Sequence, residues 1–559
     1  MITTLEAEVQ LITDIFRPPD ETMSVTIVLF YVIITAFMLM SYSHKPRKIL
    51  ETAKGYLLQL LHLSNNNAPT MIHVPPDDAP APQRVNNVWD IPGPQRWPLV
   101  GTKWIYITGR YKIAKMHDAF VDLHKRYGNV ALEVDRVPVV HLFDRADIEK
   151  VLKYPSRYPY RPPTEIVEHY RRSRPDRFAS TGIVNTQGEQ WHELRVKLTS
   201  GITSRKILLA FIPSLNEICD DFVELIRRKR DSNGCVKDFQ DLANTVGLEI
   251  ICCLVLGRRM GFLSGDRQKN EKFGKLAEAV KSTFVYISRS YYGFKLWKYL
   301  PTQLYHDYVR CEEIIYDTIA EIVNEALQEE QQQCSEDDVR SIFLSILQTE
   351  GLDTKDKIAG IIDLIHAAIE TFSNTLSFLL HNLSHLPEKQ HKISQEFDSV
   401  NPVTSTEMSN ATFTKACIKE SYRISPTTPC LARILEEDFV LSGYHLQTGT
   451  VVICHTRVAC QNEQNFRNAD KFVPERWLEQ VDENQNVYKL DEPGAPLVLP
   501  FGTGRRMCPG HRIIDIELTL VMAKIFQQFE VEYHSELDTQ FQFLLAPGIP
   551  IEVIFRDRN

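Results

Sequence analysis

Residues Phe501-Gly502-Thr503-Gly504-Arg505-Arg506-Met507-Cys508-Pro509-Gly510 are the most informative part of this 559-residue chain. They lie between a strand-like segment, PLVLP at 496–500, and an amphipathic helix predicted over 513–529. The glycines permit positive φ and close backbone approach, so amide N–H groups can point at the Cys508 sulfur just before a helix N-terminus. Both effects favour the thiolate, and a lowered pKa is what a metal-ligating cysteine requires. We therefore expect Cys508 to be a metal ligand.

The other cysteines and the net charge exclude several classes of protein. Eleven cysteines are spread along the chain without a C-x-x-C pair, which argues against a zinc cage and against a disulfide framework. Most of them, including Cys252 and Cys253 in an apolar stretch, are expected to be buried small hydrophobic residues. A formal charge of -9 argues against a nucleic-acid-binding protein, because neutralising phosphates needs a concentrated basic surface.

Helical periodicity dominates most of the chain. Apolar residues recur at three- and four-residue spacing over four further segments, namely 213–228, 246–256, 308–328 and 358–386. Short β-type runs occur at 130–134 and 138–143. The fold class is therefore predicted to be mainly α with a minor β part. Length alone would allow three or four domains, but no Pro/Gly/Ser-rich break divides the second half, so 90–559 is predicted to be one large catalytic domain.

The N-terminal part is predicted to attach the chain to a membrane. An acidic leader, 1–22, precedes an uncharged apolar run at 23–40, which as a helix would span about 27 Å. A buried core helix is the alternative. Basic residues follow this anchor, which places the catalytic part on the cytoplasmic side. Residues 41–89 are first basic and then rich in Pro and Asn, as expected of a linker.

The predicted helix at 358–386 is apolar on most faces, so the charged Glu370 beside Thr371 needs a reason. A locally paired carboxylate is one explanation. The functional explanation is proton delivery through Glu370 and the Thr371 hydroxyl. Glu420 and Arg423, at i and i+3, also share a helix face and can form an ion pair.

The pattern F-x-x-G-x-R-x-C-x-G, formed by Phe501, Gly504, Arg506, Cys508 and Gly510, resembles the haem-binding signature of the cytochrome P-450 family. The resemblance extends over about 90–555. It implies the P-450 fold, with haem b between two central helices and Cys508 as the proximal ligand of the haem iron. A thiolate opposite the oxygen site favours O–O cleavage.

The resemblance implies roles for residues far from the cysteine loop. The family's E-x-x-R helix and P-E-R-W-like segment imply a structural network of Glu420, Arg423 and Arg476 that braces the haem loop. The similar W-x-x-x-R helix, together with guanidinium recognition of carboxylates, implies a set of haem-propionate partners: Trp191, Arg195, Arg506 and, as a further candidate, Arg433.

The oxygen-activation motif is matched in part. The family pattern A-G-x-D/E-T-T is similar to Ala367-Ala368-Ile369-Glu370-Thr371-Phe372. The acid and the first threonine match, which supports catalytic roles for Glu370 and Thr371. Ala368 replaces the usual glycine and Phe372 the second threonine, which leaves open whether the helix is kinked to make room for oxygen.

Three segments, 90–106, 151–166 and 173–195, resemble one group of the mitochondrial-type clan, the arthropod ecdysteroid 20-hydroxylases. The implied reaction is hydroxylation of ecdysone at carbon 20 with O2 and two electrons. Hydroxylation of another sterol or lipophilic substrate is an alternative. Two other classes are a haem-thiolate isomerase or lyase acting on peroxides, which would lack the acid–threonine pair, and a non-catalytic sterol-binding protein.

The same resemblance implies an electron donor and a location. Members of that clan take electrons from an adrenodoxin-like ferredoxin, which would dock on a basic face to which Arg505, Arg512 and Lys419 contribute. An NADPH-dependent flavoprotein reductase is the competing donor, since the predicted anchor also suits the endoplasmic reticulum. The expected location is thus a mitochondrial membrane by resemblance, or the endoplasmic reticulum by the anchor.

Overall fold

The computed structural model describes residues 86–558, apart from gaps at 98–100, 136, 200–203, 266, 331–345, 347–348, 482–486, 490–491, 534–536 and 549–550. These residues belong to one compact unit, Val85–Asn559. The predicted leader (1–22), anchor (23–40) and nearly all of the predicted linker (41–89) lie outside the described residues.

Helices make up most of the described chain, as the periodicity predicts. Their bounds are α4 Trp104–Ile107, α5 Met116–Tyr127, α6 Arg145–Leu152, α7 Glu165–Ser173, α8 Gly182–Asn185, α9 Gly188–Thr199, α10 Arg205–Ala210, α11 Ile212–Lys229, α12 Phe239–Leu256, α13 Arg267–Tyr292, α14 Gln303–Glu330, α16 Thr354–Ser384, α17 Pro387–Glu396, α18 Ser405–Asn410, α19 Thr412–Ile424, α20 Thr456–Cys460 and α21 His511–Gln528.

The strands are short and form several small sheets. Their bounds are β1 Asn86–Asn87, β2 Val130–Asp135, β3 Val137–Leu142, β4 Cys235–Val236, β5 Leu431–Ile434, β6 Phe439–Leu441, β7 Tyr444–Leu446, β8 Val451–Cys454, β9 Glu479–Val481, β10 Val487–Lys489, β11 Phe529–Glu532, β12 Thr539–Gln542, β13 Leu544–Pro547 and β14 Val553–Asp557. The mainly α fold with a minor β part is confirmed.

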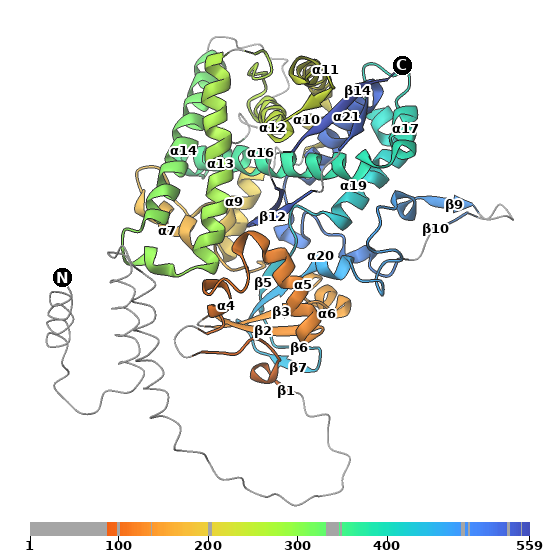
Figure 1. Cartoon of the computed structure of the whole chain (residues 1–559). Helices are drawn as coiled ribbons and strands as arrows, with labels where there is room; N and C mark the ends of the chain where they lie inside the picture. Colours follow the sequence, from red (N-terminus) through yellow and green to blue (C-terminus); the bar gives the residue numbers. More distant parts are fainter. Residues whose placement is uncertain are drawn as a thin grey trace, which may run out of the picture. The chain divides into compact units, whose positions relative to one another are not determined.

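The two predicted β runs, now β2 and β3, pair in an antiparallel hairpin within a four-stranded sheet of order β2-β3-β8-β5. β8 runs parallel to β3, with Val139 opposite Val451, and β5 runs antiparallel to β8. Their branched side chains, such as Val140 and Val452, are fully buried, which suits a pleated surface covered on one face. Figure 1 shows this sheet with α5 and α6 at one end of the unit and α11 and α12 at the other.

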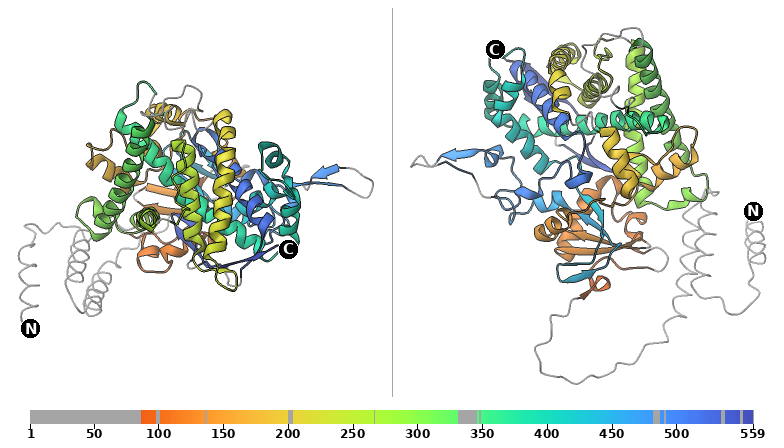
Figure 2. Two further views of the ribbon diagram at one scale, coloured as in Figure 1. Left: turned by 90° about the horizontal axis from the view of Figure 1, so that it is seen from above. Right: turned by 180° about the vertical axis from the view of Figure 1, so that it is seen from behind.

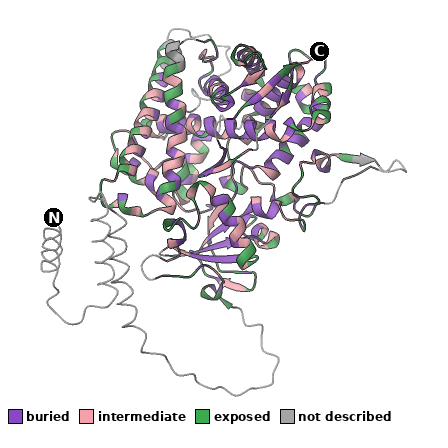
Figure 3. Ribbon diagram, viewed as in Figure 1, coloured by how far each residue is buried: buried purple, intermediate pink, exposed green. Residues whose placement is uncertain are grey.

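Helix α16 crosses the unit between these two ends, as the front view and the view from behind both show (Figures 1 and 2). It begins where the Asp353 side chain accepts a hydrogen bond from the Lys355 N–H, a typical N-cap. Most of its length is buried, so it appears largely purple in Figure 3. Helix α12 lies against it so closely that a Cβ added at Gly247 would come within 2.9 Å of the Phe372 ring.

Helix α12 is the one helix among the described residues that is long and apolar enough to cross a membrane. Because 89% of the qualifying window is buried inside the protein, its apolar character is explained by core packing. The prediction had α12 starting at Val246. The helix begins at Phe239. The prediction missed its first two turns because polar residues such as Gln240 and Asn244 conceal the apolar periodicity there.

The prediction of a strand-like segment at 496–500 is wrong. Residues Ala495–Leu497 form a 3-10 turn and the chain then runs on irregularly to Phe501. The physical reason lies in Pro496 and Pro500, which have no N–H to donate to a neighbouring strand. Leu497 is fully buried all the same, so the apolar pattern of this segment reflects core packing.

Candidate functional site

The cysteine loop is a tight turn that returns the backbone on itself. The Cys508 N–H donates to the Phe501 carbonyl oxygen at 2.8 Å, and the Met507 N–H donates to Gly504 at 3.0 Å. Gly502 and Gly504 have φ of +73° and +67°, conformations that side chains rarely tolerate. A Cβ at Gly510 would lie 3.7 Å from the Cys508 sulfur, so the loop backbone runs directly beside the sulfur.

The expectation of a lowered thiol pKa is wrong for the protein alone. Burial raises the pKa of Cys508, although the Gly510 N–H and Arg195 act in the opposite direction, as expected. Desolvation of the thiolate outweighs both effects. A bound cation reverses this balance, because a coordinating thiol is deprotonated outright. Many protein atoms surround Cys508 and desolvate its thiolate, yet the side chain itself is exposed, so a ligand can reach the sulfur.

Four arginines form a group, here called the arginine cluster, around this loop: Arg161, Arg195, Arg433 and Arg506. Arg195 Nη2 donates to the Met507 carbonyl oxygen at 2.5 Å, and Arg433 Nη2 to that of Thr503 at 3.4 Å. Arg506 donates to the Pro159 and Thr186 carbonyl oxygens, both at 2.9 Å. Over the described ranges, none of the four forms an ion pair with a carboxylate.

The charges of the arginine cluster repel one another. Burial and then Arg161, Arg433 and Arg195 lower the pKa of Arg506 to about 8. Burial, Arg433 and Arg195 likewise lower the pKa of Arg161 to about 10. The buried Arg506 Nη1 has no hydrogen-bond partner within the part of the chain that the structure describes. Such a group of cations favours a ligand with more than one negative charge, such as a dicarboxylate.

The predicted propionate partners Arg195, Arg433 and Arg506 thus lie together, and Trp191 lies beneath them. Trp191 is 1% exposed, and the Arg506 guanidinium stacks 3.8 Å from its ring centroid. Helix α9 therefore supplies a platform for Arg506 as well as the Arg195 side chain. Arg161 was missed by sequence reasoning, because it lies in an irregular Pro-rich segment without periodicity.

The accessible face of α16 lies in the middle of an otherwise buried helix. Ala367 is exposed, whereas Ile365 and Ile369 on either side of it are fully buried. The Thr371 hydroxyl donates to the Ala367 carbonyl oxygen at 2.7 Å. Phe372, which stands where the family has a second threonine, is buried against α12. A small molecule can therefore approach α16 at Ala367 and Thr371.

Glu370 faces α12 and does not hydrogen-bond to Thr371. It is 2% exposed, and Gln240 Nε2 donates to its Oε1 at 3.4 Å. Burial raises the pKa of Glu370 to about 7, although Lys281 acts in the opposite direction. A carboxyl with such a pKa can both release and accept a proton near neutral pH.

Glu420, Arg423 and Arg476 lie together, fully buried. Glu420 accepts from Arg423 Nη2 at 2.8 Å and Nε at 3.0 Å, and from Arg476 Nε at 3.1 Å. Trp477 Nε1 and the Val473 N–H also donate to it, at 2.9 and 3.0 Å. This network ties α19 to the segment that precedes the cysteine loop.

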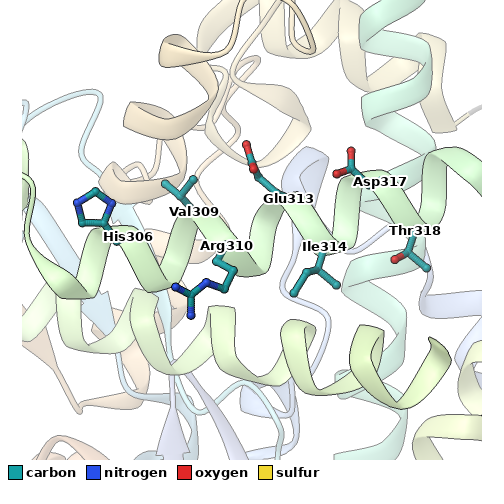
Figure 4. Close-up of a pocket in the computed structure, with 7 residues that line it drawn as sticks. All are labelled: His306, Val309, Arg310, Glu313, Ile314, Asp317 and Thr318. Atoms are coloured by element: carbon teal, nitrogen blue, oxygen red, sulfur yellow. The ribbon is translucent and has the colours of Figure 1, made fainter. Parts of the chain in front are cut away.

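A shallow groove of about 560 Å³ runs along α14, and all seven residues that line it come from that helix (Figure 4). Its two carboxylates are engaged: Glu313 pairs with Arg174, and Asp317 with Arg177 at 2.9 Å. None of the residues of the cysteine loop or of the arginine cluster lines it. We assign it no role.

Comparisons with known proteins match the stretch of chain that contains these residues. The cytochrome P450 family matches residues 91–555. The chain is 49% identical to ecdysone 20-monooxygenase of Drosophila melanogaster over 488 residues, 85% of this chain and 90% of the relative. It is 30% identical to mitochondrial 1,25-dihydroxyvitamin D(3) 24-hydroxylase of Mus musculus, over 80% of this chain and 84% of the relative. It is 27% identical to mitochondrial cytochrome P450 302a1 of Drosophila melanogaster, over 84% and 95%.

Proposed function

Because the chain belongs to the cytochrome P450 family of haem-thiolate monooxygenases, we propose that it hydroxylates ecdysone at carbon 20 to give 20-hydroxyecdysone. The observation that carries this proposal is 49% identity spread over 90% of the Drosophila ecdysone 20-monooxygenase, against 30% or less to the other two relatives named above. Hydroxylation of another sterol is the second candidate, because those relatives include a 1,25-dihydroxyvitamin D(3) 24-hydroxylase.

The residues around the cysteine loop fit haem b. Cys508 would ligate the iron, and the arginine cluster would hold the two propionates, which supply the missing negative charge. Phe501, Gly504 and Gly510 shape the loop beside the sulfur. When bound, haem supplies O2 activation and inserts one oxygen atom into a C–H bond, with two electrons and two protons converting the other atom into water.

Proton supply is the part of the reaction that falls to α16. At a pKa of about 7, the Glu370 carboxyl holds a proton in a substantial fraction of molecules at neutral pH and can act as a general acid. The Thr371 hydroxyl, which here donates to the Ala367 carbonyl oxygen, would rotate to donate its hydrogen bond to oxygen at the accessible face. The two side chains would act in series with water between them, because no hydrogen bond joins them.

We further propose a ferredoxin as electron donor and a mitochondrial membrane as location. The two relatives with mitochondrial names reported above, the 1,25-dihydroxyvitamin D(3) 24-hydroxylase and cytochrome P450 302a1, support both. The basic side chains of Arg505, Arg512 and Lys419 are exposed and would attract an acidic donor. The anchor (23–40), its leader (1–22) and the linker (41–89) would attach the catalytic domain (90–559). An NADPH-dependent flavoprotein reductase remains the alternative donor.

The test incubates the purified full-length protein with ecdysone and NADPH, together with either adrenodoxin-like ferredoxin and its reductase or the flavoprotein reductase. Products are identified by mass spectrometry. 20-Hydroxyecdysone with the ferredoxin system supports the proposal, and its absence with both donors refutes it. Cys508→Ala should lose turnover and the carbon monoxide Soret band typical of thiolate-ligated haem. A retained band would refute the assignment of the ligand.

A further inference from the structure

A seam of polar side chains is buried between α12 and α16 and includes Glu370. Helix α12 contributes Gln240 and Asn244, and α16 contributes Glu370 and Asn374, each pair one helical turn apart. Gln240 Nε2 donates to Asn374 Oδ1 at 2.8 Å and to Glu370 Oε1 at 3.4 Å. Ser377, one further turn along α16, is also buried. We call these five residues the polar seam.

The hydrogen-bonding capacity of the polar seam is only partly used. Within the described residues, five of its atoms have no partner in the protein: Gln240 Oε1, Asn244 Oδ1, Glu370 Oε2, Asn374 Nδ2 and Ser377 Oγ. The Asn374 amide lies near enough to lower the pKa of Glu370, yet its Nδ2 makes no hydrogen bond of normal geometry. Buried polar groups in folded proteins are nearly always paired, and internal water commonly supplies the missing partners.

Helix packing alone does not explain these side chains. The close approach at Gly247 and Phe372 already joins α12 to α16 with apolar contacts. Leucine or methionine would fill the positions of the amides without leaving polar atoms unpaired, and a partly satisfied polar network is less stable than an apolar one. A function that needs polar groups at this place accounts for them better.

One end of the polar seam lies close to charged groups at the surface. Asp241 follows Gln240 on α12 and is exposed, as is Glu278 on α13. Lys281, one turn further along α13, is half-buried. All three act on Glu370: Lys281 lowers its pKa, and Glu278 and Asp241 raise it. The charged side chains that act on Glu370 therefore come from α12 and α13, and two of the three are exposed to solvent.

We propose that Gln240, Asn244 and Asn374 hold a file of water molecules through which Glu370 regains its proton from solvent. They are positioning residues, since they act through Glu370, and the inference rests on the proposed role of Glu370 as proton donor. In each cycle the carboxyl O–H bond breaks as the proton leaves toward Thr371. The carboxylate then takes a proton from the nearest water, and bulk solvent replaces it, so no oxidant or reductant is needed.

The direct test is infrared spectroscopy of the Glu370 carboxyl after rapid mixing with D2O, using the haem-loaded full-length protein. The C=O band of the protonated carboxyl is identified by its loss in Glu370→Gln. Asn374→Leu and Gln240→Met replace the amides with apolar side chains of similar shape, and Asn244→Leu is a third variant should one of them fail to fold. Asn382→Leu is the matched control, because its amide lies on the same helix but donates to Ser421 Oγ at 3.1 Å.

We expect the band to exchange roughly tenfold more slowly in the seam variants than in the parent chain and in Asn382→Leu. In turnover, the seam variants should divert electrons from product to peroxide and show a larger solvent isotope effect, with an unchanged carbon monoxide Soret band. Exchange and coupling equal to those of the parent in Asn374→Leu and Gln240→Met would overturn the inference. Normal coupling in Glu370→Gln would instead overturn the donor role of Glu370, while slow exchange in the seam variants would still support the water file.

Discussion

The network around Glu420 gives the sharpest quantitative prediction. Glu420 accepts hydrogen bonds from two guanidinium groups, one indole and one backbone N–H, and it is fully buried. Glu420→Gln keeps the shape of the side chain but removes the charge and turns one acceptor into a donor. The new NH2 group would face other donors, and both arginines stay charged. Arg476 would keep its partner Glu492, whereas Arg423 would keep only carbonyl oxygens.

Removing one partner from a buried ion pair typically costs about 3–5 kcal/mol, because the remaining charge is left buried and uncompensated. Both members of the Glu420–Arg423 pair are 0% exposed, so solvent cannot compensate. The exposed pair Glu271–Lys275 provides the control, with side chains that are 69% and 68% exposed. Glu271→Gln should change the free energy of unfolding by well under about 1 kcal/mol.

Urea unfolding followed by Soret absorbance and tryptophan fluorescence measures both variants. For a chain of this size, the free energy of unfolding should fall by about 3 kcal/mol or more per M of urea. Glu420→Gln should therefore lower the urea concentration at the unfolding midpoint by about 1 M. The Soret change should come first, because the network supports the segment before the cysteine loop. A midpoint for Glu420→Gln equal to that of Glu271→Gln would refute the reasoning.

Three further outcomes are expected. Arg161→Met should release haem to apomyoglobin roughly tenfold faster, since one charge-assisted hydrogen bond is lost, and an unchanged rate would exclude Arg161 from the propionate site. Thr371→Ala should release peroxide in place of product, and unchanged coupling would remove its role. Burial raises the pKa of Glu517 from 4.5 to about 8. Its contribution to stability is therefore complete below about pH 4.5 and lost as pH rises through 8, so Glu517→Gln should gain stability relative to the parent over that range in thermal melts.

The sequence predicted those parts of the structure that depend on local periodicity. Helices α11, α14, α16 and α21 lie within a few residues of the predicted segments, because each keeps an apolar face over several turns. The strands β2 and β3 were predicted from their branched residues, whereas their antiparallel pairing was not. The cysteine loop was identified from the spacing of Phe501, Gly504 and Cys508, which short-range backbone geometry imposes.

Features that depend on contacts between distant segments were not predicted. Arg161 joins the arginine cluster only because an irregular segment after α6 approaches α9, β5 and the cysteine loop. The polar seam was likewise hidden, since Gln240 and Asn244 lie in the part of α12 that lacked a clear apolar pattern. The predicted direction of the Cys508 pKa shift was wrong, because a sequence shows the amides and cations near a thiol but not how far the protein desolvates it.

As the proposed propionate site, the arginine cluster would link binding of the prosthetic group to folding. Each of its four side chains is partly or largely buried, and burial, together with their mutual repulsion, lowers the pKa of Arg506 and of Arg161. Like charges that are partly buried without counter-charges oppose the folded state until anionic groups lie among the guanidinium groups. A ligand that binds only the folded state, and not the unfolded chain, stabilises the folded state by mass action. Here an anionic ligand would also reduce the repulsion between the arginines. The same four arginines therefore favour a dianionic partner, and we expect the stability of the structure around Cys508 to depend on it.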